Sequence, residues 1–203
     1  MTQYRSYSES QQPFMLTADD VADFFLHAAD SDGGLRRPVT NMRLQKLLYY
    51  AQAWSLALAG EPLFGEDIEA WEHGPVVRSV YMRFKQHGSH RLSTEYAQSP
   101  QLTPAQRSVL DAVWASYGDV GAARLRAMAH RERPWREARQ ARDEGDTCNV
   151  PLSHDAMREY FAARLGHDRE RRLAQQRAAY AKQPTTALEN ALGEEALGLI
   201  ATS

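Results

Sequence analysis

The sequence predicts a mainly α-helical protein, in which a compact multi-helix domain with a small β element is followed by a C-terminal helical extension. Three observations predict this fold class. Apolar residues recur at three- and four-residue steps in several separate segments, which is the pattern of amphipathic helices. Residue types that favour helix N-termini precede several of these segments. Alternation typical of a β-strand is confined to residues 66–72.

The N-terminal part is expected to hold a flexible tail and one helix. Residues 1–15 are polar and rich in Ser and Gln, and they lack the apolar core of a signal peptide. Thr17, with Asp20 three residues later, is close to a capping box, so a helix is expected to begin there. Residues 30–38 have the composition of a loop. The buried face of the helix is predicted to consist of Val21, Phe24, Phe25 and Ala28.

The clearest helix follows this loop, at the start of the stretch 41–85 around which we expect the fold to be organised. Gly60 supplies the left-handed residue that commonly ends a helix. Lys46 lies within this apolar helix, and we expect it to be partly buried with a carboxylate partner, for which Glu69 is a candidate. The residues expected on one buried face are Leu44, Leu47, Leu48, Ala51, Trp54 and Leu58.

A short extended segment and a turn come next. Apolar and polar residues alternate over 67–72, as expected of a strand with one buried face. The dipeptide Gly74-Pro75 breaks this pattern. Because proline has no N–H and a φ close to the helical value, we expect Pro75 in the first turn of a new helix, 76–85. Trp71 and His73 would then lie at the corner between strand and helix.

An exposed connection is predicted over 86–101, which could include a short strand at 92–96. Residues 103–106 (Thr-Pro-Ala-Gln) form a full capping signature, with Thr at the N-cap, Pro at the first helical position and Gln at the third. The helix that they open is expected to end at Gly118.

Three further core helices are expected. They cover 121–129, the segment from Pro134 to about residue 142, and a last helix that Ser153 can cap and Gly166 can end. The inward residues of this last helix are predicted to be Met157, Tyr160, Phe161 and Leu165.

The composition changes after Gly166. Residues 168–182 are charged and rich in Ala, with few large apolar residues. Thr186 begins another capping box, and a narrow apolar stripe follows it. We therefore expect 166–203 to form an appended helical extension that docks on the domain, on another copy of the chain as a homo-oligomer, or on a partner.

Composition limits the classes of function. The 203 residues carry a net charge of −2 and a single cysteine, Cys148, which excludes an intrachain disulfide and a Cys-rich zinc site and fits a reducing compartment. Bulk charge does not favour binding to nucleic acid. No apolar run is long enough for a transmembrane helix. We expect a cytoplasmic protein that needs no membrane, metal or cofactor.

No catalytic motif accompanies the residues that could carry chemistry. His73 is interpreted as a turn residue that hydrogen-bonds the backbone. His130 is expected to end one helix and Trp135 to anchor the next, since no second His or Cys stands at metal-ligand spacing. Cys148 lies in a loop with no activating group apparent. No catalytic residue is predicted.

Partner-binding residues are predicted at the corner and in an arginine-rich segment, 124–142. Trp and Tyr are common anchors of interfaces, although they are also common in cores. The arginine-rich segment is interpreted as a solvated face offset by acidic neighbours rather than as a nucleic-acid site, and an acidic protein partner is left open. The predicted partner-binding residues are Trp71, His73, Pro75, Tyr81, Arg136 and Arg139.

Several motifs occur in a fixed order along the chain. They are Leu44-Gln45-Lys46-Leu47-Leu48-Tyr49, Ile68-Glu69-Ala70-Trp71, Gly74-Pro75-Val76-Val77, Val80-Tyr81, His130 with Pro134-Trp135, and Met157-Arg158-Glu159-Tyr160-Phe161. Together they resemble the Panacea domain of the SocA-like antitoxins, a family also labelled phage-associated GepA-type proteins. The resemblance spans roughly 16–165, which we expect to be this domain.

The resemblance implies an antitoxin of a two-gene toxin–antitoxin system, which binds its cognate toxin protein and neutralises it by direct contact without being an enzyme. A SocA-type variant would instead be a proteolytic adaptor that delivers the toxin to the ClpXP protease. Two other classes are kept as alternatives: a DNA-binding autorepressor that uses the arginine cluster, and an enzyme acting at His73 or His130.

Overall fold

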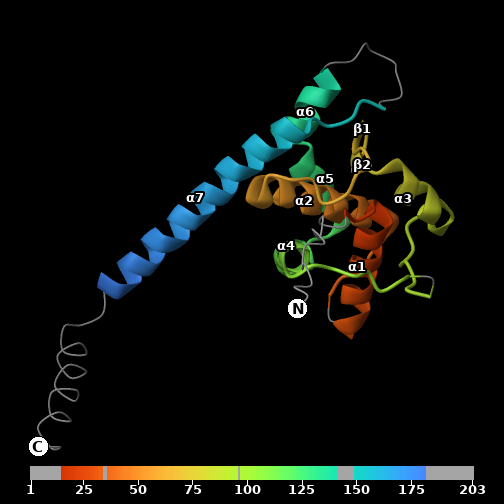
Figure 1. The fold of residues 1–203 in the computed structure, drawn as a ribbon, viewed down its shortest axis with the longest axis horizontal. Coiled ribbons are helices and arrows are strands. Elements are labelled where there is room, and N and C mark those ends of the chain that lie inside the picture. Colours follow the sequence, from red (N-terminus) through yellow and green to blue (C-terminus); the bar gives the residue numbers. More distant parts are fainter. Residues whose placement is uncertain (1–14, 34–35, 96, 141–148, 182–203) are drawn as a thin grey trace, which may run out of the picture. The chain divides into compact units, whose positions relative to one another are not determined.

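The computed structural model describes residues 15–33, 36–95, 97–140 and 149–181. These residues are mainly helical, with one small two-stranded sheet, which confirms the predicted fold class (Figure 1). Two compact units divide the chain at 1–162 and 163–203. The elements are α1 (Ala18–Ser31), α2 (Asn41–Ala59), β1 (Glu69–Trp71), β2 (Gly74–Val76), α3 (Arg78–Phe84), the short 3₁₀ helix η1 (Lys85–His87), α4 (Pro104–Tyr117), α5 (Ala122–Ala129), α6 (Arg133–Gln140) and α7 (His154–Ala181).

Helix α2 forms the centre of the first unit. Thr40 caps its start, and Gly60 ends it with a left-handed backbone (φ 79°), as predicted for Gly60. The elements α1, α3, α4, α5 and β2 all contact it. The predicted face is buried at Leu44, Leu47, Leu48 and Ala51, but burial is not limited to it, because α2 is buried on nearly all sides from Arg43 to Ala53. Leu58, predicted to be buried, is 59% exposed in the last turn.

Polar side chains allow α2 to be buried in this way. Arg43 donates hydrogen bonds to backbone carbonyls in the 37–38 loop. The amide of Gln52 accepts hydrogen bonds from the backbone N–H groups of residues 63–64 and donates one to the Phe64 carbonyl (3.0 Å). Because these buried side chains form hydrogen bonds with loop backbone, they hold the loops against α2.

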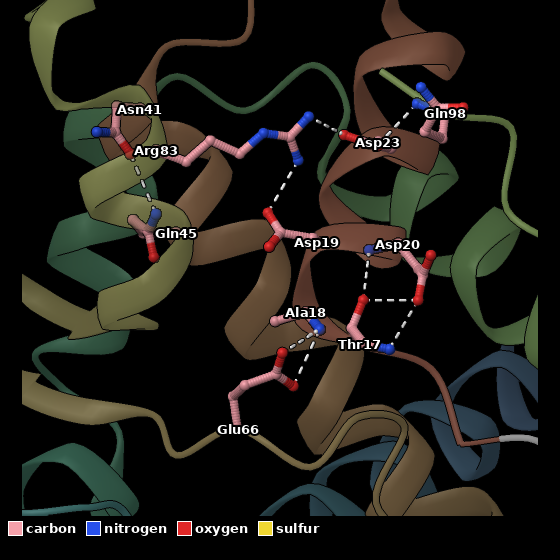
Figure 2. Close-up of polar contacts among 10 residues, drawn as sticks. All are labelled: Thr17, Ala18, Asp19, Asp20, Asp23, Asn41, Gln45, Glu66, Arg83 and Gln98. Atoms are coloured by element: carbon pink, nitrogen blue, oxygen red, sulfur yellow. Dashed lines mark hydrogen bonds and ion pairs between the residues drawn. The ribbon is translucent and has the colours of Figure 1, made fainter. Parts of the chain in front are cut away.

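The predicted capping box at the start of α1 is confirmed, and Figure 2 shows it. The Thr17 hydroxyl accepts a hydrogen bond from Asp20 N, and the Asp20 carboxylate accepts one from Thr17 N (2.8 Å). Glu66 adds a second carboxylate, which accepts from the Ala18 N–H at 2.9 and 3.0 Å. Negative charge at a helix N-terminus is favourable, so Glu66 ties its loop to the first turn of α1.

Helix α3 is fixed to α1 by ion pairs (Figure 2). The guanidinium of Arg83 lies 2.8 Å from a carboxylate oxygen of Asp19 and 2.8 Å from one of Asp23. Asp23 is only 4% exposed, and its other oxygen accepts a hydrogen bond from Gln98 N (2.8 Å). One buried carboxylate therefore holds α1, α3 and the loop before α4 together.

Strands β1 and β2 form an antiparallel hairpin whose turn consists of Glu72 and His73. The alternation predicted for 67–72 is confirmed, since Ile68 and Ala70 are buried and their neighbours are partly exposed. Gly74 takes a left-handed φ of 99° immediately after the turn. The 150–152 segment pairs with the other side of β1, through Ala70 N to Val150 O (2.9 Å) and Leu152 N to Ile68 O (2.8 Å).

The expectation that Pro75 begins a helix was wrong. Pro75 lies in β2 opposite Ala70, and α3 begins only at Arg78. The Ala70 N–H points away from β2, to Val150, so this is a pair in which the two strands exchange no hydrogen bonds. A proline at such a position removes no ladder bond, because its missing N–H would point away from β1 as well.

Two other predictions need correction. The optional strand at 92–96 is not formed in its described residues, 92–95, where Leu92 N donates to Val39 O (2.8 Å) within irregular structure. Helix α7 does not end at Gly166 but continues to Ala181. A glycine inside a helix costs only about 1 kcal/mol, and the Ala, Arg, Glu and Gln residues that follow are strong helix formers.

The remaining helix predictions are largely confirmed. Thr103 and Gln106 form the predicted capping box with Pro104 at the first position, and α4 ends before Gly118. The Ser153 hydroxyl accepts a hydrogen bond from Ala156 N (3.3 Å) at the start of α7. Met157 and Phe161 are buried in the first unit.

Some predictions lie outside the described residues. They concern the tail up to residue 14, the segment 141–148 with Cys148, and the helix proposed after Thr186. In the second unit, residues 163–181 are helical, and Arg171 lies 3.8 Å from Asp168, one turn earlier. Among the described helices, none combines the length and the apolarity that a membrane span requires.

Candidate partner-binding site

Two aromatic side chains meet beside the hairpin. The rings of Trp71 on β1 and Tyr81 on α3 are in edge-to-face contact, with centroids 4.9 Å apart. Both side chains are half-buried, so each keeps part of its ring in solvent. The indole N–H of Trp71 donates to the Glu69 carboxylate (2.6 Å), which fixes the ring on the surface of the sheet.

Helix α6 packs against the same strand. The indole N–H of Trp135 donates to the Trp71 carbonyl (3.1 Å). The guanidinium of Arg139 lies 5.7 Å from the centre of the Trp135 ring and donates to the Ala70 carbonyl at 3.4 Å. The imidazole of His130, at the end of α5, stacks on the other side of this junction against Trp135, with centroids 4.0 Å apart. An aromatic and cationic cluster therefore packs against the end of β1.

Lys46 of α2 lies beneath the hairpin. It is 1% exposed, and its Nζ donates to the Pro75 carbonyl at 2.9 Å. Burial, together with the nearby charge of Arg126, lowers the pKa of Lys46 to about 7. The expected partner Glu69 was wrong, since that carboxylate binds the Trp71 indole instead. Lys46 supports the hairpin by holding a backbone carbonyl, not by forming an ion pair with Glu69.

Gly74 is required where Lys46 passes under the turn. A Cβ on this residue would lie 2.7 Å from Lys46 Cε, closer than any normal contact. The next α2 side chain toward the N-terminus, Gln45, accepts a hydrogen bond from Val77 N at 2.9 Å. Consecutive residues of α2 therefore hold both ends of the Pro75–Val77 backbone, and the position of the hairpin is fixed by the most buried helix of the fold.

Positive charge is concentrated around the junction of hairpin and α6. Burial lowers the pKa of His130, and so do the charges of Arg126, Lys46, His73 and Arg139. The Nε2 atom of His130 and the Nε atom of Arg126 are buried without a hydrogen-bond partner among the described residues. We call Trp71, His73, Tyr81, Trp135 and Arg139, with Lys46, Arg126 and His130 behind them, the hairpin site.

The structure brings together most of the predicted binding residues. Trp71 and Tyr81 are in contact, and Arg139 reaches the hairpin from α6. His73 is exposed in the turn, whereas Pro75 is buried and contributes its carbonyl rather than a surface. Arg136 is exposed on α6, one turn before Arg139.

Sequence reasoning missed the groups that support this surface. The hydrogen bond from Lys46 to Pro75 joins residues 29 positions apart, and that from Trp135 to Trp71 joins residues 64 positions apart. For the hydrogen bond from Lys46 to Pro75, the one available indication in the sequence was a lysine in the middle of an apolar helix. The described residues contain no group of three or more His, Cys, Asp or Glu side chains able to hold a metal ion.

The arginine-rich segment does not form one continuous surface. Arg133 pairs with Glu137 (3.5 Å) and with Glu159 of α7 (2.8 Å), while Arg139 turns toward the hairpin. Of the described arginines, Arg133 therefore belongs to an intramolecular network and Arg139 to the hairpin site.

Comparisons with known proteins identify similar chains. The family model described as "Antitoxin SocA-like, Panacea domain" matches residues 44–136. This range runs from α2 into α6 and includes every residue of the hairpin site except Arg139. The antitoxin SocA of Caulobacter vibrioides (strain NA1000 / CB15N) is 30% identical over 138 residues, which is 62% of this chain and 72% of that protein. No solved structure matches the chain significantly.

Proposed function

The chain belongs to the SocA-like Panacea-domain antitoxin family, and we propose from this that it neutralises a cognate toxin protein by direct contact in the cytoplasm. We place the toxin-binding surface at the hairpin site. The observation that carries the proposal is the family match, which centres on the helix, hairpin and α6 segments that build this site. Neutralisation by contact requires a stable complementary surface and no chemistry, so the chain acts as a binding protein rather than an enzyme.

The composition of the hairpin site supports this role. Trp, Tyr and Arg are the residue types that contribute most binding energy in protein interfaces. Trp71 and Tyr81 are half-exposed and already in contact, so little side-chain freedom remains for a partner to remove. Arg139 is held by the Ala70 carbonyl and by the Trp135 ring, which positions its charge in the same way.

The rigidity of the scaffold supports it as well. The hairpin is anchored by Gln45 and Lys46 from below, by the 150–152 segment along β1, and by Trp135 from α6. A surface held from three sides is preorganised, and preorganisation lowers the entropic cost of association. These anchors come from three separate parts of the chain, so the surface forms only in the folded protein.

The test is growth of cells in which the adjacent gene is induced, with and without this chain, followed by co-purification. We expect the neighbouring product to be toxic alone, harmless with the chain, and recovered in complex with it. Toxin level then separates two modes of action: a steady level indicates occlusion, and a level that falls unless ClpXP is removed indicates a proteolytic adaptor.

Two results of this experiment would overturn the proposal. A neighbouring product that is harmless, or that remains toxic and does not bind the chain, contradicts an antitoxin role for this pair. Salt-dependent binding of the chain to its own promoter would then favour the autorepressor.

A further inference from the structure

We propose that the hairpin site binds an acidic segment of its partner, with an aspartate or glutamate side chain seated between the His73 turn and Arg139. This inference rests on the proposed function, because it states the chemistry of the toxin surface that the antitoxin recognises. It specifies that the recognised surface of the toxin is negatively charged, which the family match does not indicate.

The first support is the arrangement of cationic groups. Arg139 is held over Trp135 and against the Ala70 carbonyl, so its position follows the backbone of β1. His130 stacks on the same indole, and Lys46 lies directly beneath Pro75. His73 is exposed in the turn that joins β1 to β2. Four groups that carry or can carry positive charge thus surround one short hairpin.

Three carboxylates of the neighbourhood have partners other than Arg139. Glu69 is bound by the Trp71 indole at 2.6 Å. Glu132 is 2% exposed and accepts a hydrogen bond from the Tyr50 hydroxyl (3.3 Å). Glu137 faces Arg133 at 3.5 Å. Glu69, partly buried on β1, and Glu72, exposed in the turn beside His73, add negative charge at the hairpin itself.

The protonation behaviour of His130 agrees with this description. Burial lowers the pKa of His130, and the basic residues Arg126, Lys46, His73 and Arg139 lower it further. Arg126 and His130 each keep a buried ring or guanidinium nitrogen with no hydrogen-bond partner in the described part of the chain. The positive potential that these basic residues place at His130 is complementary to an anionic side chain.

The aromatic residues explain why a carboxylate on a peptide segment fits better than a free anion. The half-exposed rings of Trp71 and Tyr81 flank the charged groups and offer apolar surface to the chain around the acidic residue. Such a surface excludes water from the ion pair, which strengthens it. Arg139, with a planar guanidinium, can bind both oxygens of the carboxylate.

The test uses substitutions of opposite charge at one exposed position. Binding of the full chain to the purified product of the adjacent gene is measured by calorimetry or surface-based kinetics at low and moderate salt. We expect His73→Glu to weaken binding about fivefold or more and His73→Lys to tighten it about two- to fivefold, with the difference reduced as salt is raised. Glu72→Gln is expected to tighten binding in the same direction.

Matched controls separate local charge from net charge. Arg107→Gln and Asp111→Asn change the charge of α4 by one unit in each direction, and they are expected to alter binding less than twofold. Circular dichroism confirms that each variant is folded. His73 makes no hydrogen bond in the described structure, so its substitutions are not expected to disturb the hairpin.

Each outcome decides the inference. Weaker binding with His73→Glu and tighter binding with His73→Lys support the inference. If His73→Glu tightens binding and His73→Lys weakens it, the partner surface is basic. If neither substitution changes the affinity, charge at the hairpin does not contribute to recognition. Both results overturn the inference and leave the antitoxin role intact. If the wild-type chain does not bind the neighbouring product at all, the proposed function fails, and the inference fails with it.

Discussion

The buried amine of Lys46 gives a prediction that depends on the structure rather than on the family. Its Nζ is held by the Pro75 carbonyl beneath the hairpin, and it is 1% exposed. Burial and the charge of Arg126 lower its pKa to about 7 in the folded protein, while a lysine in the unfolded chain has a pKa of about 10.4. The perturbation is Lys46→Met, which keeps the length of the side chain and removes the titrating group.

The sign of the effect follows from proton binding. Below a pH of about 7, Lys46 is protonated in both states and contributes no pH dependence. Between about pH 7 and pH 10, the unfolded chain holds a proton that the folded protein has released, so the free energy of unfolding rises with pH. The slope for one such group is about 1.4 kcal/mol per pH unit, which amounts to about 2 kcal/mol between about pH 7.5 and pH 9.

Urea unfolding followed by circular dichroism, at a series of pH values, measures this slope. Groups other than Lys46 that titrate in the window are present in both proteins and cancel in the difference between wild type and Lys46→Met. We expect this difference to shift by about 2 kcal/mol in favour of the wild type as pH rises from about 7.5 to 9. Parallel curves over this range would show that the pKa of the amine is at or above its ordinary value, and this result refutes the reasoning.

Three other substitutions test the scaffold and the site. Trp71→Ala is expected to weaken toxin binding at least about tenfold, as for an interface anchor. Leu58→Ala, at an exposed apolar residue of α2, is expected to leave binding unchanged, and calorimetry distinguishes the two. Arg83→Ala leaves the buried carboxylate of Asp23 without its ion-pair partner and is expected to lower the free energy of unfolding by about 2–4 kcal/mol. Arg107→Ala, which breaks an exposed pair with Asp111, is expected to lower it by under about 1 kcal/mol in the same urea measurement. Gly74→Ala is expected to destabilise by about 1–3 kcal/mol more than Gly60→Ala, because both have positive φ but only the former places a Cβ against Lys46; equal losses would show that Lys46 moves aside.

Local chemistry explains which parts of the fold could be predicted. Thr17, Thr103 and Ser153 were identified as helix caps because a cap requires only residues within one turn of each other. The left-handed Gly60 is a local feature for the same reason. Pro75 could not be placed this way, since its strand position depends on pairing with Ala70 and on the 150–152 segment far along the chain.

The same distinction applies to burial and to the site. Gln52 and Arg43 are polar residue types that periodicity assigns to the surface, yet they are buried because loop backbone outside α2 needs their hydrogen bonds. Trp71 and Tyr81 could be proposed as binding residues from their types and their place at a turn. The cluster that Trp135, Arg139 and His130 form against them depends on where α6 packs, which no local pattern encodes.

The motifs that carry the family resemblance are separate in the sequence but form one hydrogen-bonded unit. Gln45 and Lys46 of the first motif bind Val77 N and Pro75 O of the Gly-Pro-Val-Val motif. The latter motif pairs with Glu69–Trp71, and Trp135 of the later motif donates to Trp71. A chain that keeps these residue types therefore keeps the hairpin in place, while exposed residues such as His73 can change without cost to the scaffold. Partner choice in this fold is thus expected to depend on the turn and the outer face of α6, which is why the charge of His73 and Arg139 is the property to vary.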